Sequence, residues 1–293
     1  MIMVKNMDDK KSLFKKIIII TFIIIIIITG LVLYSRYIAT TGLIVKEYKI
    51  TSEKLTDNFH GLKIVHLSDL HYGSTFDEKD LEKVVEKIKI IKPDIVVLTG
   101  DLFDTRFKLN DDQKQTIIKN LSKIDVTIGK YAIAGEQDTD EDWEKIIKES
   151  GFINLNNDYT SIYNSGSNYI FMAGISSNLN DDEKITKIDN YLNTLTDNNK
   201  PIYNILLLHE PDYITEIDYT KYDLVLAGHS HGGGIRLPFI GAIFLEEGAK
   251  KYHDEYYKLG NTDLYISSGL GTSNIDFRFL NKPSFNFYRL TNK

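Results

Sequence analysis

The sequence contains no cysteine. This absence excludes disulfide bonds, thiolate metal ligands, a cysteine nucleophile and a lipid-modified cysteine as a membrane anchor. Any metal ion must therefore be held by histidine, carboxylate or amide groups. Such ligands suit zinc, manganese and iron, and ligand type alone does not choose among these metals.

Basic residues are scarce beyond the N-terminus. The 293-residue chain has 35 Lys and Arg against 41 Asp and Glu, and residues 1–36 hold six of the basic residues but only two of the acidic ones. A nucleic-acid-binding protein usually presents a basic face, so we expect no nucleic-acid partner. Internal repeats and long low-complexity linkers are also absent from the sequence, which favours one large α/β domain with an appendage.

One long apolar run is present near the start. Ile17 to Tyr34 form eighteen mostly aliphatic residues, and a helix of this length nearly matches the hydrocarbon core of a bilayer. Five lysines precede the run and only Arg36 follows closely, so the positive-inside rule predicts a cytoplasmic tail over residues 1–16, a single-pass anchor over residues 17–34 and an extracytoplasmic domain at the cell membrane. A cleaved signal peptide is the alternative, because a basic start before an apolar run fits both.

The remaining chain divides into a connection and a catalytic domain. Residues 35–60 are polar and partly extended, with an alternating pattern at residues 46–50 that is typical of a short strand. Residues 61–293 are expected to form the catalytic domain.

Strand and helix patterns alternate at the start of this domain. Apolar runs at residues 63–68 and 94–99 predict buried strands, and the helical spacing between them predicts a helix that begins near Asp77. A third such unit starts at Tyr131. Both buried strands end at acidic residues, where open α/β sheets place their ligands. Further strands are expected at residues 168–173, 203–208, 222–227, 263–267 and 284–289.

Polar motifs follow five of these strands in series. They are Asp69-Leu70-His71, Gly100-Asp101, Gly135-Glu136-Gln137-Asp138, His209 and Gly228-His229-Ser230-His231. Each motif alone is common, but five strand-end motifs in this order indicate one composite site. His229 and His231 alternate in an extended segment, so both side chains are expected on one side.

With these motifs the sequence resembles the calcineurin-like metallophosphoesterase superfamily. The hydrophobic N-terminus followed by Leu67-Ser68-Asp69-Leu70-His71 is similar to its bacterial, membrane-anchored or exported branch. The resemblance implies a two-sheet α/β sandwich flanked by helices, here preceded by one transmembrane helix. It also implies two divalent metal ions (manganese, zinc or iron) at the strand ends, and a shared hydroxide that attacks phosphorus.

The resemblance also implies a role for each motif. The first metal would be held by Asp69, His71 and His231, the second by His209 and His229, and Asp101 would bridge both. The glycine-rich stretch Ser267 to Ser273 resembles a turn that the family places near its substrate, with an ordinary tight turn as the alternative. His66 is expected to pack in the core, and Asp104 either orients a ligand or is a plain loop carboxylate.

The third motif departs from the family pattern. The family usually has Gly-Asn-His-Asp where this chain has Gly135-Glu136-Gln137-Asp138. Glu136 can still bind the second metal through its carboxylate. Gln137, expected at the catalytic position, can donate a hydrogen bond but cannot deliver a proton. General-acid help is worth about 10²–10⁴-fold, so substrates with acidic leaving groups, such as pyrophosphates and aryl phosphodiesters, should suffer least.

The sequence thus predicts a metal-dependent hydrolase that acts on a small or lipid-linked phosphorylated compound at the outer face of the membrane. The alternative is a degenerate family member that binds metal or a phosphorylated ligand without efficient turnover, and only the pair Glu136-Gln137 favours it. A protein phosphatase is disfavoured because no segment of the sequence suggests a peptide groove.

Overall fold

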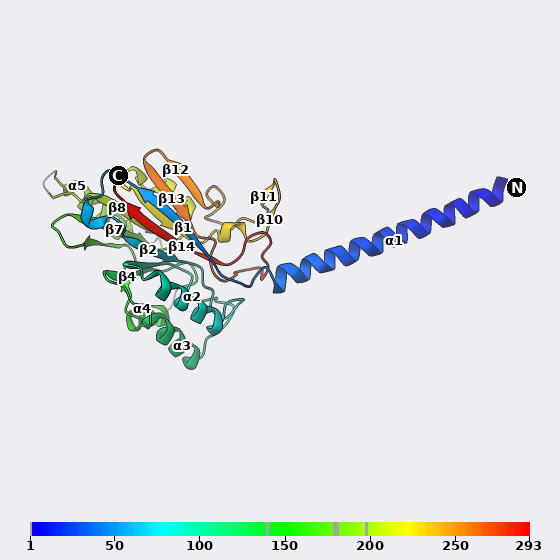
Figure 1. Cartoon of the computed structure of the whole chain (residues 1–293), viewed down its shortest axis with the longest axis horizontal. Coiled ribbons are helices and arrows are strands. Elements are labelled where there is room, and N and C mark those ends of the chain that lie inside the picture. The colour runs from blue at the N-terminus through cyan, green and yellow to red at the C-terminus, as the bar shows by residue number, and fades with distance from the viewer. Residues whose placement is uncertain (1, 139–140, 178–181, 197–198) are drawn as a thin grey trace.

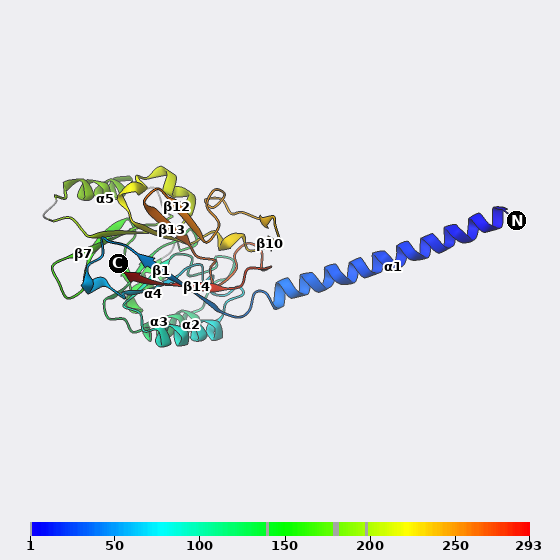
Figure 2. The ribbon, with the colours of Figure 1, turned by 45° about the horizontal axis from the view of Figure 1, so that its top comes forward.

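Two six-stranded sheets and one projecting helix make up the fold (Figures 1 and 2). The computed structural model describes residues 2–138, 141–177, 182–196 and 199–293. The helices are α1 (Ile2–Tyr37), α2 (Glu78–Ile91), α3 (Asp111–Ser122), α4 (Glu141–Glu149) and α5 (Asp182–Thr194).

The strand order shows how the two halves of the chain combine. The first sheet has the order β1-β14-β2-β3-β4-β5, with β1 (Ile44–Thr51), β14 (Ser284–Thr291), β2 (Lys63–Leu67), β3 (Ile95–Thr99), β4 (Gly129–Ile133) and β5 (Ile153–Asn154). The second has the order β12-β13-β9-β8-β7-β6, with β12 (Tyr256–Leu259), β13 (Thr262–Ile266), β9 (Leu224–Ala227), β8 (Tyr203–Leu208), β7 (Tyr169–Ile175) and β6 (Asp158–Tyr163). A small separate hairpin joins β10 (Arg236–Leu237) to β11 (Gly241–Ala242).

Burial on both faces explains the continuous apolar runs of the central strands. Side chains of β3 alternate between two clusters: Val97 packs between the sheets with residues of β8 and β9, whereas Val96 packs against the helices. Helices α2, α3 and α4 contribute to the cluster on the outer face of the first sheet, and α5 contributes to the cluster on the second. The predicted two-sheet α/β sandwich flanked by helices is confirmed.

Helix α2 begins where the sequence predicts, for a specific reason. The side chain of Asp77 accepts hydrogen bonds from the backbone N–H groups of Lys79 and Asp80, and Asp80 closes a capping box. Such a cap stabilises a helix start by about 1 kcal/mol. The fixed start ends the loop that follows β2.

The structure also differs from the sequence-based expectations. The short strand expected at residues 46–50 is present as β1, but the segment 35–60 is more than a connection: β1 pairs in parallel with β14, and Leu55 and Phe59 are buried in the core between the sheets. Strand β1 lies at the edge of the sheet and is only partly buried, so its sequence is polar and does not indicate that it pairs with β14. Helix α3 and strands β5, β6, β10, β11 and β12 were not predicted.

Helix α1 projects from the sandwich (Figure 1). From Lys11 to Tyr37 it is long and apolar enough to cross a membrane, with a mean hydropathy of 3.1, and its apolar stretch is not buried against the domain. The predicted anchor at residues 17–34 lies inside this candidate span.

Candidate metal centre

The polar motifs meet at one edge of the sandwich. Strands β2 and β3 of the first sheet lead into Asp69, His71 and Asp101, whereas β8 and β9 of the second lead into the three remaining histidines. Six of the seven predicted ligands are buried, all except Glu136: Asp69, His71, Asp101, His209, His229 and His231. The two sheets therefore build the site jointly.

The backbone at these residues is strained. Asp69, His71, Asp101, His229 and His231 have φ values of 51°, 41°, 55°, 64° and 48°. The left-handed region costs non-glycine residues roughly 1–2 kcal/mol each. Such strain concentrates at functional sites, where the chain must turn sharply to aim a side chain. Backbone strain thus accompanies five of the six buried candidates, and His209 is the exception.

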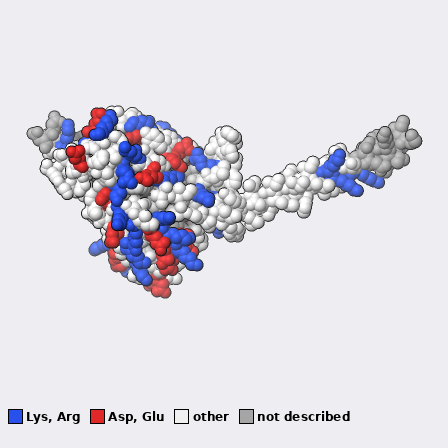
Figure 3. All heavy atoms as spheres, in the orientation of Figure 1, with Lys and Arg blue, Asp and Glu red and all other residues white. Residues whose placement is uncertain are grey.

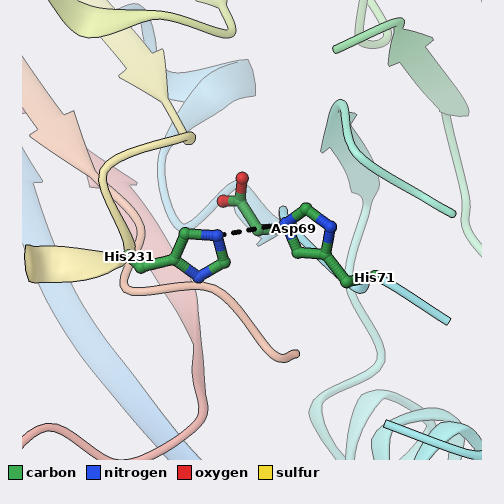
Figure 4. Close-up of side chains that lie close together, drawn as sticks. All are labelled: Asp69, His71 and His231. Atoms are coloured by element: carbon green, nitrogen blue, oxygen red, sulfur yellow. Dashed lines mark hydrogen bonds between the residues drawn. The ribbon is translucent and has the colours of Figure 1, made fainter. Parts of the chain in front are cut away.

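Asp69, His71 and His231 form a first cluster (Figure 4). One ligand atom from each lies within 4.8 Å of the others, and the Nε2 atoms of His71 and His231 are 3.0 Å apart. Burial and the neighbouring His71 lower the pKa of His231. A neutral His231 keeps a lone pair available for a metal ion.

Asp101, His209 and His229 form a second cluster with the same spacing limit. His209 donates from Nδ1 to the carbonyl oxygen of Thr99 over 2.6 Å, which leaves its buried Nε2 without a hydrogen-bond partner. His229 donates from Nε2 to the carbonyl oxygen of Glu247, which leaves its Nδ1 available. Carbonyl partners of this kind fix the ring orientation of metal-binding histidines.

Asp101 lies between the two clusters. Its Oδ2 is 3.5 Å from His71 Nε2 and 3.6 Å from His209 Nε2, and its Oδ1 accepts a hydrogen bond of 3.0 Å from the backbone N–H of Gln137. Burial opposes a charged His209, but Asp101 and Asp69 raise the pKa of His209 to about 10. A metal ion at His209 Nε2 would displace this proton.

The donor set fits divalent metal ions. Four buried imidazoles and two buried carboxylates converge, and the unpartnered Nε2 of His209 lies 3.6 Å from a carboxylate oxygen of Asp101. Nitrogen and oxygen donors of this kind bind borderline divalent cations.

Residues 62–233 match the family model described as calcineurin-like phosphoesterase. The chain belongs to this family. It is 31% identical over 264 residues to the uncharacterized metallophosphoesterase YkuE of Bacillus subtilis, and the match covers 88% of each chain. Family membership makes the protein a metal-dependent phosphoesterase, as the sequence predicted.

Two further relatives match over a smaller share of their own length. A transmembrane protein with metallophosphoesterase domain from Danio rerio is 27% identical, over 81% of this chain and 55% of its own length. The UDP-2,3-diacylglucosamine pyrophosphatase LpxG of Chlamydia trachomatis is 27% identical, over 62% of this chain and 67% of its own.

Glycines let the loops of this phosphoesterase approach one another. A Cβ on Gly228 would overlap the Oγ of Ser68 and lie 2.9 Å from Asp69 Oδ2. A Cβ on Gly269 would lie 2.8 Å from the Cβ of Asp69 and 3.1 Å from His231 Nδ1. The glycine-rich stretch from Ser267 to Ser273 thus lies against the first cluster.

The third motif is placed differently from the clustered ligands. Glu136 is exposed and belongs to neither cluster. Its carboxylate nevertheless interacts electrostatically with His229, Asp101 and His209. Gln137 is tied at both ends: Nε2 donates to Ser273 Oγ over 2.9 Å, and Oε1 accepts from the backbone N–H of Thr105 over 3.0 Å.

The other singled-out residues support the loops. His66 is buried, with Nε2 2.7 Å from Thr99 Oγ1, as expected of a packed histidine. The carboxylate of Asp104 pairs with the guanidinium of Arg106 at 2.5 Å. Asp104 is therefore a loop carboxylate engaged by its own neighbour.

Sequence reasoning assigned no role to two buried residues beside the site, Arg278 and Asp138. Arg278 is fully buried, and its Nη2 donates to the carbonyl oxygens of Gly269 and Gly271 over 3.1 and 2.6 Å. Asp138 accepts backbone hydrogen bonds from Leu102 and Gly135, both of 2.9 Å. The fourth position of the third motif signalled Asp138, but no local pattern signals a buried arginine.

Proposed function

We propose that the protein is a dinuclear metal-dependent hydrolase of phosphoesters or pyrophosphates at the outer face of the membrane. The position of Asp101 Oδ2 between His71 Nε2 and His209 Nε2 carries this proposal. Asp69, His71 and His231 would hold one divalent ion, His209 and His229 the other, with manganese, zinc or iron as candidates. Two such ions supply water activation and charge neutralisation when bound.

The chain's own groups indicate which substrates are favoured. The amide of Gln137 is hydrogen-bonded at both ends, to Ser273 and to Thr105. An amide cannot supply a proton to a leaving group. A substrate whose leaving group needs no protonation avoids this deficit. Pyrophosphates, nucleoside diphosphate conjugates and aryl phosphodiesters have such leaving groups.

A lipid-linked pyrophosphate meets two conditions: its leaving group needs no protonation, and its lipid part lies in the membrane that the candidate helix would cross. LpxG, by its name, is a pyrophosphatase of UDP-2,3-diacylglucosamine. We infer that this chain acts on a substrate of the same general kind, a phosphate compound held at the bilayer. The proposal that the substrate carries a lipid rests on helix α1, because its candidate membrane span ends beside the domain.

A metal-dependent assay tests the hydrolase proposal. Purified full-length protein in detergent is assayed with manganese on an aryl phosphodiester, and Asp101→Asn is compared with Asp158→Asn, an exposed carboxylate on β6. We expect Asp101→Asn to lower the rate at least about 100-fold and to reduce bound metal, because one carboxylate serves both clusters. Asp158→Asn should behave as wild type. Hydrolysis that is absent from wild type, or unchanged in Asp101→Asn, would contradict the proposal.

The degenerate alternative rests on Glu136 and Gln137 alone. Glu136 lies outside the clusters and Gln137 offers no proton. In that case the protein would bind metal or a phosphorylated ligand without efficient turnover. Metal binding with negligible hydrolysis of every leaving-group class would favour this function.

A further inference from the structure

The loop around β10 and β11 is apolar and exposed. Residues 237–245 read Leu-Pro-Phe-Ile-Gly-Ala-Ile-Phe-Leu and contain no charged side chain. Phe239 is fully exposed, Ile240 is 72% exposed, and Ile243 and Phe244 are 42% and 56% exposed. A contiguous apolar patch of this kind on a soluble surface marks an interaction site.

A neighbouring loop extends this surface. Ile275 and Leu280 are 47% and 57% exposed, and the backbone N–H of Arg236 donates to the carbonyl oxygen of Phe279 over 2.9 Å. We call the exposed side chains of the two loops the apolar rim: Phe239, Ile240, Ile243, Phe244, Ile275 and Leu280.

The apolar rim is joined directly to the end of the candidate membrane span. The backbone N–H of Arg278 donates to the carbonyl oxygen of Ser35 over 3.0 Å, and the rings of Tyr34 and Phe279 meet edge to face at 6.0 Å. A salt bridge of 3.5 Å joins Arg36 to Asp276. The rim and the end of α1 therefore form one connected structure.

The views show the β10-β11 hairpin on the side of the sandwich from which α1 leaves. In Figures 1 and 2 the β10-β11 hairpin lies on the same side as the base of α1. In Figure 3 the hairpin lobe is white, whereas blue and red side chains gather elsewhere on the sandwich. An uncharged surface beside a membrane-spanning helix matches the apolar part of a bilayer.

We propose that the apolar rim docks into the bilayer beside α1, as a second membrane contact of this protein. The tip is a hairpin turn, and an irregular backbone does not enter the hydrocarbon core of a bilayer, so the contact is shallow and interfacial. Phe239 has a φ of 65°, an unfavourable conformation for a bulky residue. This turn holds its ring away from the domain, where a bilayer receives it.

Docking sets the mouth of the site against the membrane. A pocket beside His231 is lined by Phe244, Ile275, Phe277 and Arg278, so it opens between the metal centre and the apolar rim. A phosphorylated lipid can then keep its apolar part at the bilayer while its phosphate reaches the clusters. This consequence rests on the proposed hydrolase function, whereas the docking itself does not.

Tryptophan fluorescence tests the docking without any assay of hydrolysis. The chain has one tryptophan, Trp143, which is 1% exposed and provides a constant background. Full-length Phe239→Trp and Ile240→Trp are reconstituted in phosphatidylcholine vesicles with and without brominated acyl chains. Ile90→Trp is the matched control, because Ile90 is 75% exposed on α2, away from the rim.

We expect brominated lipid to remove most of the emission added at positions 239 and 240 and to leave that at position 90 unchanged. Equal quenching at the three positions, or none at 239 and 240, would overturn the proposal. Blue-shifted but unquenched emission at the rim would also overturn it, since another protein surface would then cover these residues. Loss of hydrolysis alone would bear on the proposed function and not on the docking.

Discussion

At the residue scale, hydrogen bonds decide which atoms of the site can meet a metal ion. The carbonyl oxygen of Thr99 occupies Nδ1 of His209 and leaves Nε2 toward Asp101. In the same way, Gln137 has its amide occupied by Thr105 and Ser273. These contacts leave His209 Nε2 without a hydrogen-bond partner and hold the Gln137 amide in place.

Replacing Gln137 with histidine tests what the missing proton donor costs. We expect Gln137→His to raise hydrolysis of alkyl phosphoesters by at least about 10-fold relative to aryl esters, because general-acid help is worth about 10²–10⁴-fold for poor leaving groups. Steady-state rates on paired alkyl and aryl substrates measure this. Gln137→Asn, which loses the contacts without supplying an acid, is the control, and equal effects of both variants would show that the native acid lies elsewhere.

His66 predicts a pH dependence of stability. Burial lowers the pKa of His66 from 6.5 to about 3. Below pH 6.5 the unfolded chain gains a proton that the folded chain refuses, so the stability due to neutral His66 is complete above pH 6.5 and is lost as the pH falls toward 3. Between pH ~7.5 and ~4.5, wild type should lose about 2–3 kcal/mol more than His66→Gln, at about 1.4 kcal/mol per pKa unit.

Urea unfolding of EDTA-treated protein at several pH values measures this difference. Removal of metal keeps ligand protonation from differing between wild type and variant. Parallel pH profiles for the two proteins would refute a neutral His66 in the fold.

At the element scale, the site depends on how closely strand-end loops approach. The loops after β2 and β9 come together because Gly228 has no side chain to meet Ser68 and Asp69. The backbone N–H of His229 then reaches both carboxylate oxygens of Asp69, at 2.9 and 3.1 Å. A first-sheet ligand is thus oriented by a second-sheet loop.

Gly228→Ala should therefore weaken metal binding while the fold persists. We expect a loss of metal affinity of about 10–100-fold, the usual effect of disturbing a group that orients a ligand, measured by calorimetric titration. Gly166→Ala is the control, because its nearest neighbour would be the side chain of Asn58 at 3.3 Å, in another loop. Removing the Ser68 hydroxyl in a Ser68→Ala/Gly228→Ala variant should restore part of the affinity. No recovery would mean that the clash with the Ser68 hydroxyl does not cause the loss of metal affinity.

At the scale of the whole molecule, α1 supplies the candidate membrane span and the sandwich supplies the candidate metal centre. The candidate span ends at Tyr37, and within a few residues β1 joins the sheet by pairing with β14. A connection this short keeps the metal centre close to the membrane surface. Orientation then decides which compartment supplies the substrate.

The cysteine-free chain allows a clean test of orientation. Lys79→Cys places a thiol on exposed α2, and Lys11→Cys places one near the start of the apolar helix. We expect a membrane-impermeant maleimide to label position 79 in intact cells and position 11 only after permeabilisation, as the positive-inside rule requires. The reverse pattern would invert the topology. A labelled domain that lacks residue 11 would instead establish cleavage of the N-terminal segment.

The sequence by itself determined the local features of this protein. Continuous apolar runs predicted the central strands, and helical spacing of apolar residues predicted α2. The run from Ile17 to Tyr34 indicated the candidate anchor, and the order of the strand-end motifs indicated the family. The ligand types followed from the same motifs. These features depend on neighbouring residues, so a linear pattern carries them.

Only the tertiary structure decided how distant segments meet. It placed Asp101 between two clusters, left Glu136 outside both, and added β1 to the sheet through β14, more than 200 residues away. It also brought the apolar rim beside α1. Such contacts arise from sheet order and loop packing across the whole chain, which no local periodicity encodes.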